Sequence, residues 1–349
     1  LYINLAGLVS SDLTWEKAST FNIGLDFTML NQRLDFSFDW YQRTTSDMLV
    51  KVEYPEVLGT TAPPANKAEL RTRGWEVSVK WNDRIGNDFS YDLGFILSDS
   101  QAEITKYENP SGTLSDYYVG QKIGEIWGYE TEGFYQSDTD VQNHADQSKL
   151  GANWAPGDIM YKDLDGNKKI NNGSNTLDDH GDLKVIGNTT PRYQYGITAN
   201  MSYKNVYLNV FFQGIGKRDF WPSSQPFWPV ATQYYNTQKW FVTDSWSEDN
   251  RDAYFARPIA RETKNQQKQT KYLQDASYCR LKNLTVGYDF PKSWLSFLHV
   301  AKAGVYFSAE NLFEFTNVKG AYDPEAAGKN GTMVYPFQRT YSFGLNVTF

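Results

Sequence analysis

Strict alternation of apolar and polar residues recurs along this chain and limits its possible folds more than any other feature. In residues 341–349, for example, Tyr, Phe, Leu, Val and Phe alternate with Ser, Gly, Asn and Thr. A period of two residues is that of a β-strand whose two faces have different surroundings. Nine such runs lie near residues 21–29, 34–41, 75–82, 89–98, 193–203, 206–212, 277–290, 300–311 and 341–349.

The length of these runs separates two classes of all-β protein. Strands of soluble proteins usually have about five or six residues. Runs of about ten residues, apolar on one face and small or polar on the other, are typical of a transmembrane β-barrel. Aromatic residues such as Trp40, Trp75 and Trp81 lie at run ends, where an interfacial girdle forms. We therefore predict an all-β fold, a transmembrane antiparallel β-barrel. A soluble sandwich or propeller is the alternative, although no blade-like repeat is visible.

The connections between the runs also fit a membrane barrel. Short turns alternate with long loops, as in outer-membrane barrels with periplasmic turns and extracellular loops. The long connections, which we expect to be extracellular, are about 44–72, 99–190, 215–276 and 312–337.

Nine strands cannot complete such a barrel by themselves. An open sheet would leave edge amides without partners in lipid, and bacterial single-chain barrels have even strand numbers. We therefore expect residues 1–349 to be part of a larger barrel. Its remaining strands would lie in the same polypeptide or in a second chain.

Composition excludes several other functions. The net charge is −7 and no basic run is present, so nucleic acid is not an expected partner. One Cys and three scattered His argue against a multi-Cys metal site, a His-based zinc site and a recognisable catalytic triad. Asp and Glu residues are plentiful, but no pair is singled out, and we predict no enzymatic activity.

One segment carries the spacing of a calcium loop. Asp163, Asp165 and Asn167 supply oxygens at positions one, three and five, and Ile170 is the apolar residue at position eight. Lys168 departs from the EF-hand pattern, which has Gly at position six. Asp158 lies upstream, and further acidic residues that could close the site follow at Asp178, Asp179 and Asp182. The predicted calcium ligands are therefore Asp158, Asp163, Asp165, Asn167, Asp178 and Asp179, and a metal-free solvated turn is the alternative.

Aromatic residues of the long loops form a second candidate group. Their flat faces could stack on sugar rings or contact a covering protein at the rim of the barrel. The alternative, which we favour for most of them, is packing of the loops, because aromatic residues dominate such burial. The candidates are Trp127, Trp154, Trp221, Trp228, Trp240 and Trp246.

Several segments, in order, carry a family resemblance across nearly the whole chain. They include RGWEVSVKW (73–81), VGQKIGEIWGYETEGFY (119–135), PGDIMYKDLDGNKKI (156–170), SAENLFEFTNVKGAYDPE (308–325) and YPFQRTYSFGLNVTF (335–349). With these segments the chain resembles the C-terminal portion of the SusC/RagA-type TonB-dependent outer-membrane transporters of Bacteroidetes.

The resemblance implies a 22-stranded barrel closed by an N-terminal plug, and a TonB box for energy coupling; neither the plug nor the TonB box is in these residues. It further implies the outer membrane of a Gram-negative bacterium, a SusD-like surface lipoprotein as a lid, and an oligosaccharide or peptide as cargo. There are two alternatives. One is a TonB-dependent transporter of a siderophore or vitamin, and the other is a soluble carbohydrate-binding β-protein.

Overall fold

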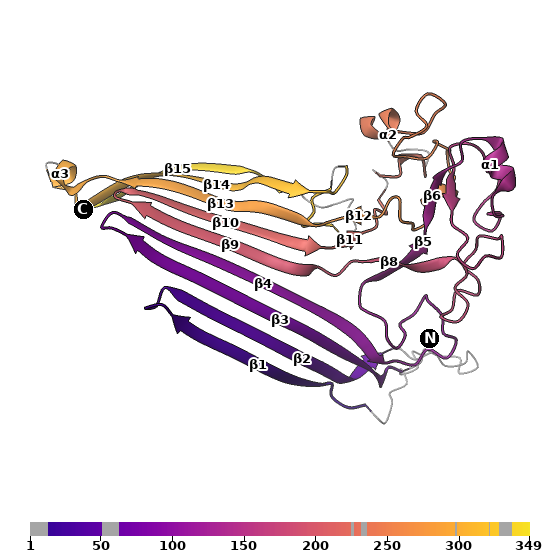
Figure 1. Cartoon of the computed structure of the whole chain (residues 1–349), viewed down its shortest axis with the longest axis horizontal. Helices are drawn as coiled ribbons and strands as arrows, with labels where there is room; N and C mark the ends of the chain where they lie inside the picture. The colour runs from indigo at the N-terminus through magenta and orange to yellow at the C-terminus, as the bar shows by residue number, and fades with distance from the viewer. Residues whose placement is uncertain are drawn as a thin grey trace, which may run out of the picture.

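Nine long strands form one antiparallel sheet in the computed structural model, which describes residues 13–50, 63–224, 227–231, 236–296, 299–320, 322–327 and 337–349. The strands are β1 (Lys17–Met29), β2 (Leu34–Val50), β3 (Ala65–Ile85), β4 (Phe89–Lys106), β9 (Arg192–Tyr203), β10 (Val206–Lys217), β13 (Tyr278–Asp289), β14 (Lys302–Thr316) and β15 (Thr340–Thr348). They follow one another across the sheet in this order (Figure 1). The predicted antiparallel all-β fold is confirmed, with β1 and β15 at the two edges of the sheet.

The strand register places apolar side chains on one face of the sheet. Phe36 lies opposite Phe27 on one side and Val79 on the other, and Ile197 lies between Phe95 and Phe212. Many large apolar side chains of this face are exposed in the chain alone. An apolar, exposed sheet face is what a lipid-facing barrel wall requires.

The opposite face is polar and carries hydrogen bonds that cross the strands. Asn209 donates to Asn200, at 2.8 Å, and Asn200 donates to Asp92, at 3.2 Å. Ser90 and Ser202 share a hydrogen bond of 2.8 Å. Because this face is too polar for hydrocarbon, it is the face toward the water-filled interior, which we call the inner face.

Tyrosine rings of the inner face lie over glycines of the neighbouring strand. Tyr207 lies opposite Gly287, and a Cβ added to Gly287 would come within 2.1 Å of the Tyr207 ring. The same arrangement joins Tyr306 to Gly344, where the distance would be 2.2 Å. Glycine is therefore required at these positions so that the ring can lie flat across the strand.

We expect Gly287→Ala to destabilise the barrel by about 1–3 kcal/mol, because the added methyl group forces the Tyr207 ring out of place. The measurement is the fraction of heat-resistant, folded barrel in the outer membrane. The double variant Gly287→Ala with Tyr207→Ala is the control, since it removes the ring that clashes. A single variant as stable as the wild type would contradict the packing argument.

Short turns and long loops lie at opposite ends of the sheet (Figure 1). The turns of the β1–β2 and β3–β4 hairpins lie at the same end as the helix α3 (Lys292–Leu295). Two further short helices, α1 (Asp138–Asn143) and α2 (Lys239–Thr243), belong to the loop end. Among the described residues, no helix combines the length and the apolar character needed to cross a membrane.

Some strands extend beyond the boundaries that the alternation suggested. The loops were expected at about 44–72 and 99–190, but β2 ends at Val50, β3 begins at Ala65 and β4 ends at Lys106. These strand ends carry polar or charged side chains, such as the pair Arg71 and Glu103, and so lack the apolar alternation by which a lipid-facing strand is recognised.

The long loops contain small sheets of their own. β5 (Glu125–Tyr129) pairs with β8 (Leu183–Asn188), and β6 (Thr131–Phe134) pairs with β7 (Ile159–Tyr161). A third pair joins β11 (Asp219–Phe220) to β12 (Gln274–Asp275). Two 3-10 turns, η2 (Pro229–Ala231) and η3 (Lys264–Gln266), complete the described elements of the loops. The loops are therefore folded structures at one end of the sheet.

Candidate functional site

Two long loops fold together into one body at the loop end of the sheet. We call the described parts of residues 107–191 and 218–277 the rim module. Its core is aromatic, and the rings of Phe227, Phe255 and Tyr272 pack with centroid distances of 5.3–6.2 Å. The buried members of this core are Tyr129, Phe134, Ile159, Tyr161, Ile170, Phe227, Trp228, Phe241, Trp246, Ala253, Phe255, Ala256 and Tyr272.

Backbone hydrogen bonds connect the two loops directly. The Tyr129 N–H donates to the Lys268 carbonyl, at 2.8 Å, and the Thr270 N–H donates to the Tyr129 carbonyl, at 3.1 Å. Gly128 permits this close approach, because a Cβ there would lie 2.5 Å from the Lys268 oxygen. Segments about 140 residues apart in sequence are thus joined by an isolated parallel β-bridge.

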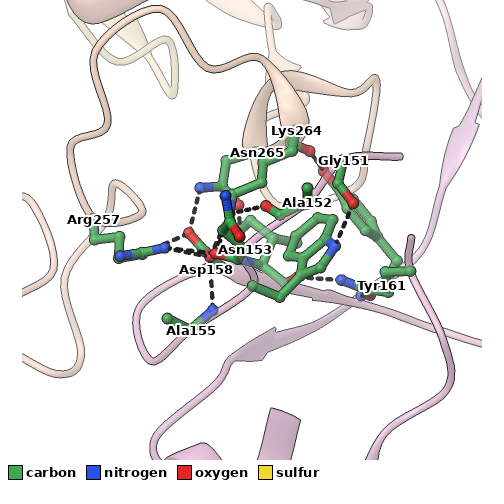
Figure 2. A network of polar contacts seen from close by, with 12 residues as sticks. Gly151, Ala152, Asn153, Ala155, Asp158, Tyr161, Arg257, Lys264 and Asn265 are labelled. Atoms are coloured by element: carbon green, nitrogen blue, oxygen red, sulfur yellow. Dashed lines mark hydrogen bonds and ion pairs between the residues drawn. The ribbon is translucent and has the colours of Figure 1, made fainter. Parts of the chain in front are cut away.

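A buried carboxylate joins the same two loops through side chains (Figure 2). Asp158 is fully buried, and its carboxylate accepts from Arg257 Nε and Nη2 at 2.8 and 2.9 Å and from Asn265 Nδ2 at 2.9 Å. Lys264 Nζ lies 3.0 Å from the same carboxylate. Burial opposes the charged form, but the hydrogen bonds from Arg257, Asn265 and Lys264 outweigh it and lower the pKa of Asp158 below its usual value.

Lys264 is itself almost completely enclosed, with only 2% of its surface exposed. Its ammonium donates to the carbonyl oxygens of Ala152 and Asn153, at 2.9 and 2.8 Å, and lies 4.8 Å from the centre of the Trp154 ring. The Tyr161 hydroxyl donates to the Lys264 carbonyl, at 2.7 Å. The Lys264 ammonium, through Ala152, Asn153 and Asp158, thus holds one loop against the other.

The structure engages Asp158, a predicted calcium ligand, in ion pairs that disfavour a metal ion at this position. Its two oxygens already accept hydrogen bonds from two cationic side chains, Arg257 and Lys264. A divalent cation placed there would be repelled by both of these charges. Sequence spacing could not reveal this, because both partners lie about 100 residues downstream.

The other predicted metal ligands are divided between two places. Ligand oxygens of Asp163, Asp165 and Asp182 all lie within 4.8 Å of one another. Asn167 is beside them and donates to Asp165, at 2.7 Å. Asp179 instead accepts hydrogen bonds from the backbone and hydroxyl of Ser174, at 2.9 and 2.6 Å. The remaining candidate is exposed Asp178, which is not a member of the three-carboxylate group.

Backbone hydrogen bonds hold the three-carboxylate group in place. Asp163 accepts from the N–H groups of Gly166 and Lys168, both at 2.8 Å, and these bonds lower its pKa although burial opposes the shift. Buried Asp182 accepts from the N–H groups of Leu164 and Asn171, at 2.8 and 2.9 Å. Because the loop supplies its own donors, its shape does not require an ion. The calcium site therefore stays a prediction, with Asp182 in place of Asp178 and Asp179.

If calcium binds here, removing it should make residues 163–182 more sensitive to protease, because an ion that binds only the folded loop stabilises it. The measurement is the rate of cleavage in this segment with calcium and with a chelator. Asp165→Asn should abolish the difference, and Asp178→Asn, outside the group, should leave it intact. Equal cleavage rates in the wild type would favour the metal-free turn.

The six loop tryptophans pack mainly within the rim module. Trp228 and Trp246 are buried in its core, and Trp154, Trp221 and Trp240 pack against it. Trp127 is half-buried, and its Nε1 donates to the Tyr118 hydroxyl, at 3.1 Å. Trp228 and Trp246 offer no open face to a sugar, which agrees with the packing alternative. Contact with a lid or cargo stays a prediction for the partly exposed rings.

The chain is similar to known membrane receptors along most of its length. The sequence model of the family described as TonB dependent receptor-like, beta-barrel matches residues 2–312. A TonB-dependent receptor of Formosa agariphila is 30% identical over 371 residues, which cover 99% of this chain and 35% of that protein. The TonB-dependent receptor SusC of Bacteroides thetaiotaomicron is 27% identical, over 97% of this chain and 32% of its own length.

Solved structures show the same likeness. The structure of the RagAB peptide transporter aligns with a TM-score of 0.72 and 25% identity, and covers 97% of this chain and 36% of that chain. A RagAB peptide importer structure in a closed-closed state aligns equally well, with a TM-score of 0.72. The chain spans about a third of the length of the curated relatives it matches.

Proposed function

The chain belongs to the TonB-dependent receptor-like β-barrel family, and from this premise we propose that it forms part of an importer of oligosaccharides or peptides. The importer would lie in the outer membrane of a Gram-negative bacterium and would depend on TonB. The observation that carries the proposal is the nine-stranded sheet, apolar on one face and polar on the other, with a folded rim module at one end. Such a wall separates lipid from a polar interior through which a solute can pass.

The cargo class rests on the relatives. SusC and the RagAB peptide transporter are both similar to this chain, and the second is named for peptide transport. The polar inner face, with its Asn, Ser and Asp side chains, offers hydrogen bonds that suit either a glycan or a peptide. A siderophore or vitamin complex is the less supported cargo, since the relatives above are not described as carrying one.

A SusD-like surface lipoprotein is the partner we propose. The rim module supports this proposal because its loops are folded into one body with a packed core, and so present a preformed surface to a lid. The energy-coupling partner, TonB, is supported by the family and would act through a region outside these residues. We infer a transport role without catalysis, since the relatives are receptors and transporters.

The test is uptake by cells that carry the full-length protein. Deletion of its gene should abolish growth on the glycan or peptide that it imports, and deletion of the gene for TonB should do the same. A control strain with the gene restored should recover growth. Uptake that persists without TonB would contradict the proposed mechanism, and a protein that fractionates away from the outer membrane would contradict the proposed location.

A further inference from the structure

Arg280 is a buried arginine on the inner face of β13. The register places its neighbour Leu281 opposite lipid-facing Phe212 and Phe313, so Arg280 points to the other side of the sheet, opposite Gln213 and Glu314. Only 1% of its surface is exposed. A buried cation on a barrel wall is costly unless carboxylates surround it.

Three carboxylates surround Arg280, those of Glu314, Asp323 and Glu325. The last two come from a segment outside the sheet. Nη2 lies 2.7 Å from Asp323, and Nη1 lies 2.6 Å from Glu325. Lys282, also on β13, adds contacts of 2.9 and 3.0 Å to Glu325. Residues 322–327 are therefore bound to the inner face of the barrel wall by two cations.

The same short segment is also bound to the rim module. The hydroxyl of Tyr322 hydrogen-bonds to Ser224, and its ring lies 5.4 Å from the ring of Phe220 and 6.3 Å from that of Phe227. Ala327, which is 2% exposed, packs against Phe220 and Ala276. One end of the loop after β14 thus touches both the module and the wall.

We propose that residues 322–327 form a strap that holds the rim module to the inner wall of the barrel and narrows its extracellular entrance, with Arg280 as the positioning residue. The strap lies on the inner face because its carboxylates reach side chains of that face. The narrowing of the entrance matters only if the protein is a transporter, and so this half of the proposal rests on the proposed function. The attachment of the strap does not depend on that function.

Within the part of the chain that the structure describes, the attachment leaves one donor of Arg280 unused. Among the described residues, Arg280 Nε has no hydrogen-bond partner, and a carboxylate oxygen of Glu314 lies 3.9 Å from it. An arginine with one donor unused gains less from its pairing than a fully bonded one.

The attachment can be tested by the accessibility of Ala327. In the full-length protein, Cys279 is replaced by Ala and Ala327 by Cys, and the rate of maleimide labelling is measured on whole cells. The buried site should react slowly. Arg280→Gln should speed the reaction at least about tenfold, because the local opening that exposes the cysteine at position 327 then costs less free energy. Arg339→Gln is the matched control, since Arg339 contacts Glu314, at 3.7 Å, without contacting the strap.

An unchanged labelling rate in Arg280→Gln would overturn the proposal. If this variant fails to give heat-resistant barrel, the pair Asp323→Asn and Glu325→Gln releases the strap from the other side and leaves the wall intact. That double variant should then show the same acceleration. Labelling is measured without transport, so a failure of the proposed function would leave its result readable.

The entrance is tested on the same cells by labelling of a cysteine placed at Gln194, an exposed inner-face residue near the loop end of β9, with a bulky, membrane-impermeant maleimide. With Cys279 replaced by Ala, Arg280→Gln should be labelled faster at this position than Arg339→Gln. Equal rates there, together with faster labelling at Ala327, would show that the strap is attached as described but does not narrow the entrance.

Discussion

Asp158→Ala is expected to cost about 3–5 kcal/mol of rim-module stability, because it leaves buried Lys264 and half-buried Arg257 without their shared counter-ion. The nine-stranded sheet should remain, since this network joins loops and does not involve the strands of the wall. The measurement is limited proteolysis of the rim module in membranes, beside the heat resistance of the barrel.

Two variants sharpen this test. Asp158→Asn keeps the shape but removes the charge and should lose most of the same stability, whereas Asp178→Ala removes an exposed carboxylate and should change little. Protease resistance equal to the wild type in Asp158→Ala would show that the aromatic core alone holds the loops.

The same carboxylate predicts how the rim module responds to acid. The folded pKa of Asp158 is lowered, so its stabilising effect is complete above its unfolded pKa of about 3.9. This contribution is lost as the pH falls through the lower folded value. Protease resistance of the module should therefore persist at mildly acidic pH and decline only below about pH 4.

Ile197→Arg is expected to destabilise the barrel by about 2–4 kcal/mol if the residue lies near the middle of the membrane. Ile197 is 40% exposed on the apolar face, between Phe95 and Phe212, and an arginine there would face hydrocarbon. The measurement is the denaturant midpoint of the barrel refolded into lipid vesicles.

The matched control for this prediction is Asn200→Arg, which lies on the inner face of the same strand, β9. Arginine at this position would face water and could pair with Asp92, so the midpoint should change much less. Spin labels at Ile197 and Thr198 give a second measurement, and should report lipid and water respectively. Equal effects of the two arginines would contradict the assignment of the faces.

The wall of the barrel could be predicted from sequence because its signal is local. A period of two, repeated over about ten residues, specifies a strand and assigns each side chain to a face, as for Phe36 and Ile197. The family resemblance drawn from the ordered segments was also confirmed by the likeness to SusC and RagAB. The charged ends of β2, β3 and β4 were missed, because they lie where no lipid imposes an apolar face.

The rim module could not be predicted in the same way. Asp158 has its partners 99 and 106 residues away, and no spacing rule connects residues at such a separation. The predicted calcium ligands depend partly on local sequence and partly on long-range folding. Asp163 and Asp165 are brought together by their local turn. Which of Asp178, Asp179 and Asp182 joins them depends on the path of the chain after that turn. Residues 322–325 of the strap belong to a segment that carries the family resemblance, but the sequence does not reveal their contacts with Arg280.

The interleaving of the two loops has a consequence for how the protein is made. The rim module takes its core from residues on both sides of the β9–β10 hairpin, so neither loop can bury its aromatic side chains alone. In the topology proposed above, both loops would have to reach the outside of the cell before the core can form there. Contacts so distant in sequence form slowly and leave apolar surface exposed meanwhile. Escort by chaperones during biogenesis, more than the stability of the finished protein, would then limit how many aromatic residues these loops can carry.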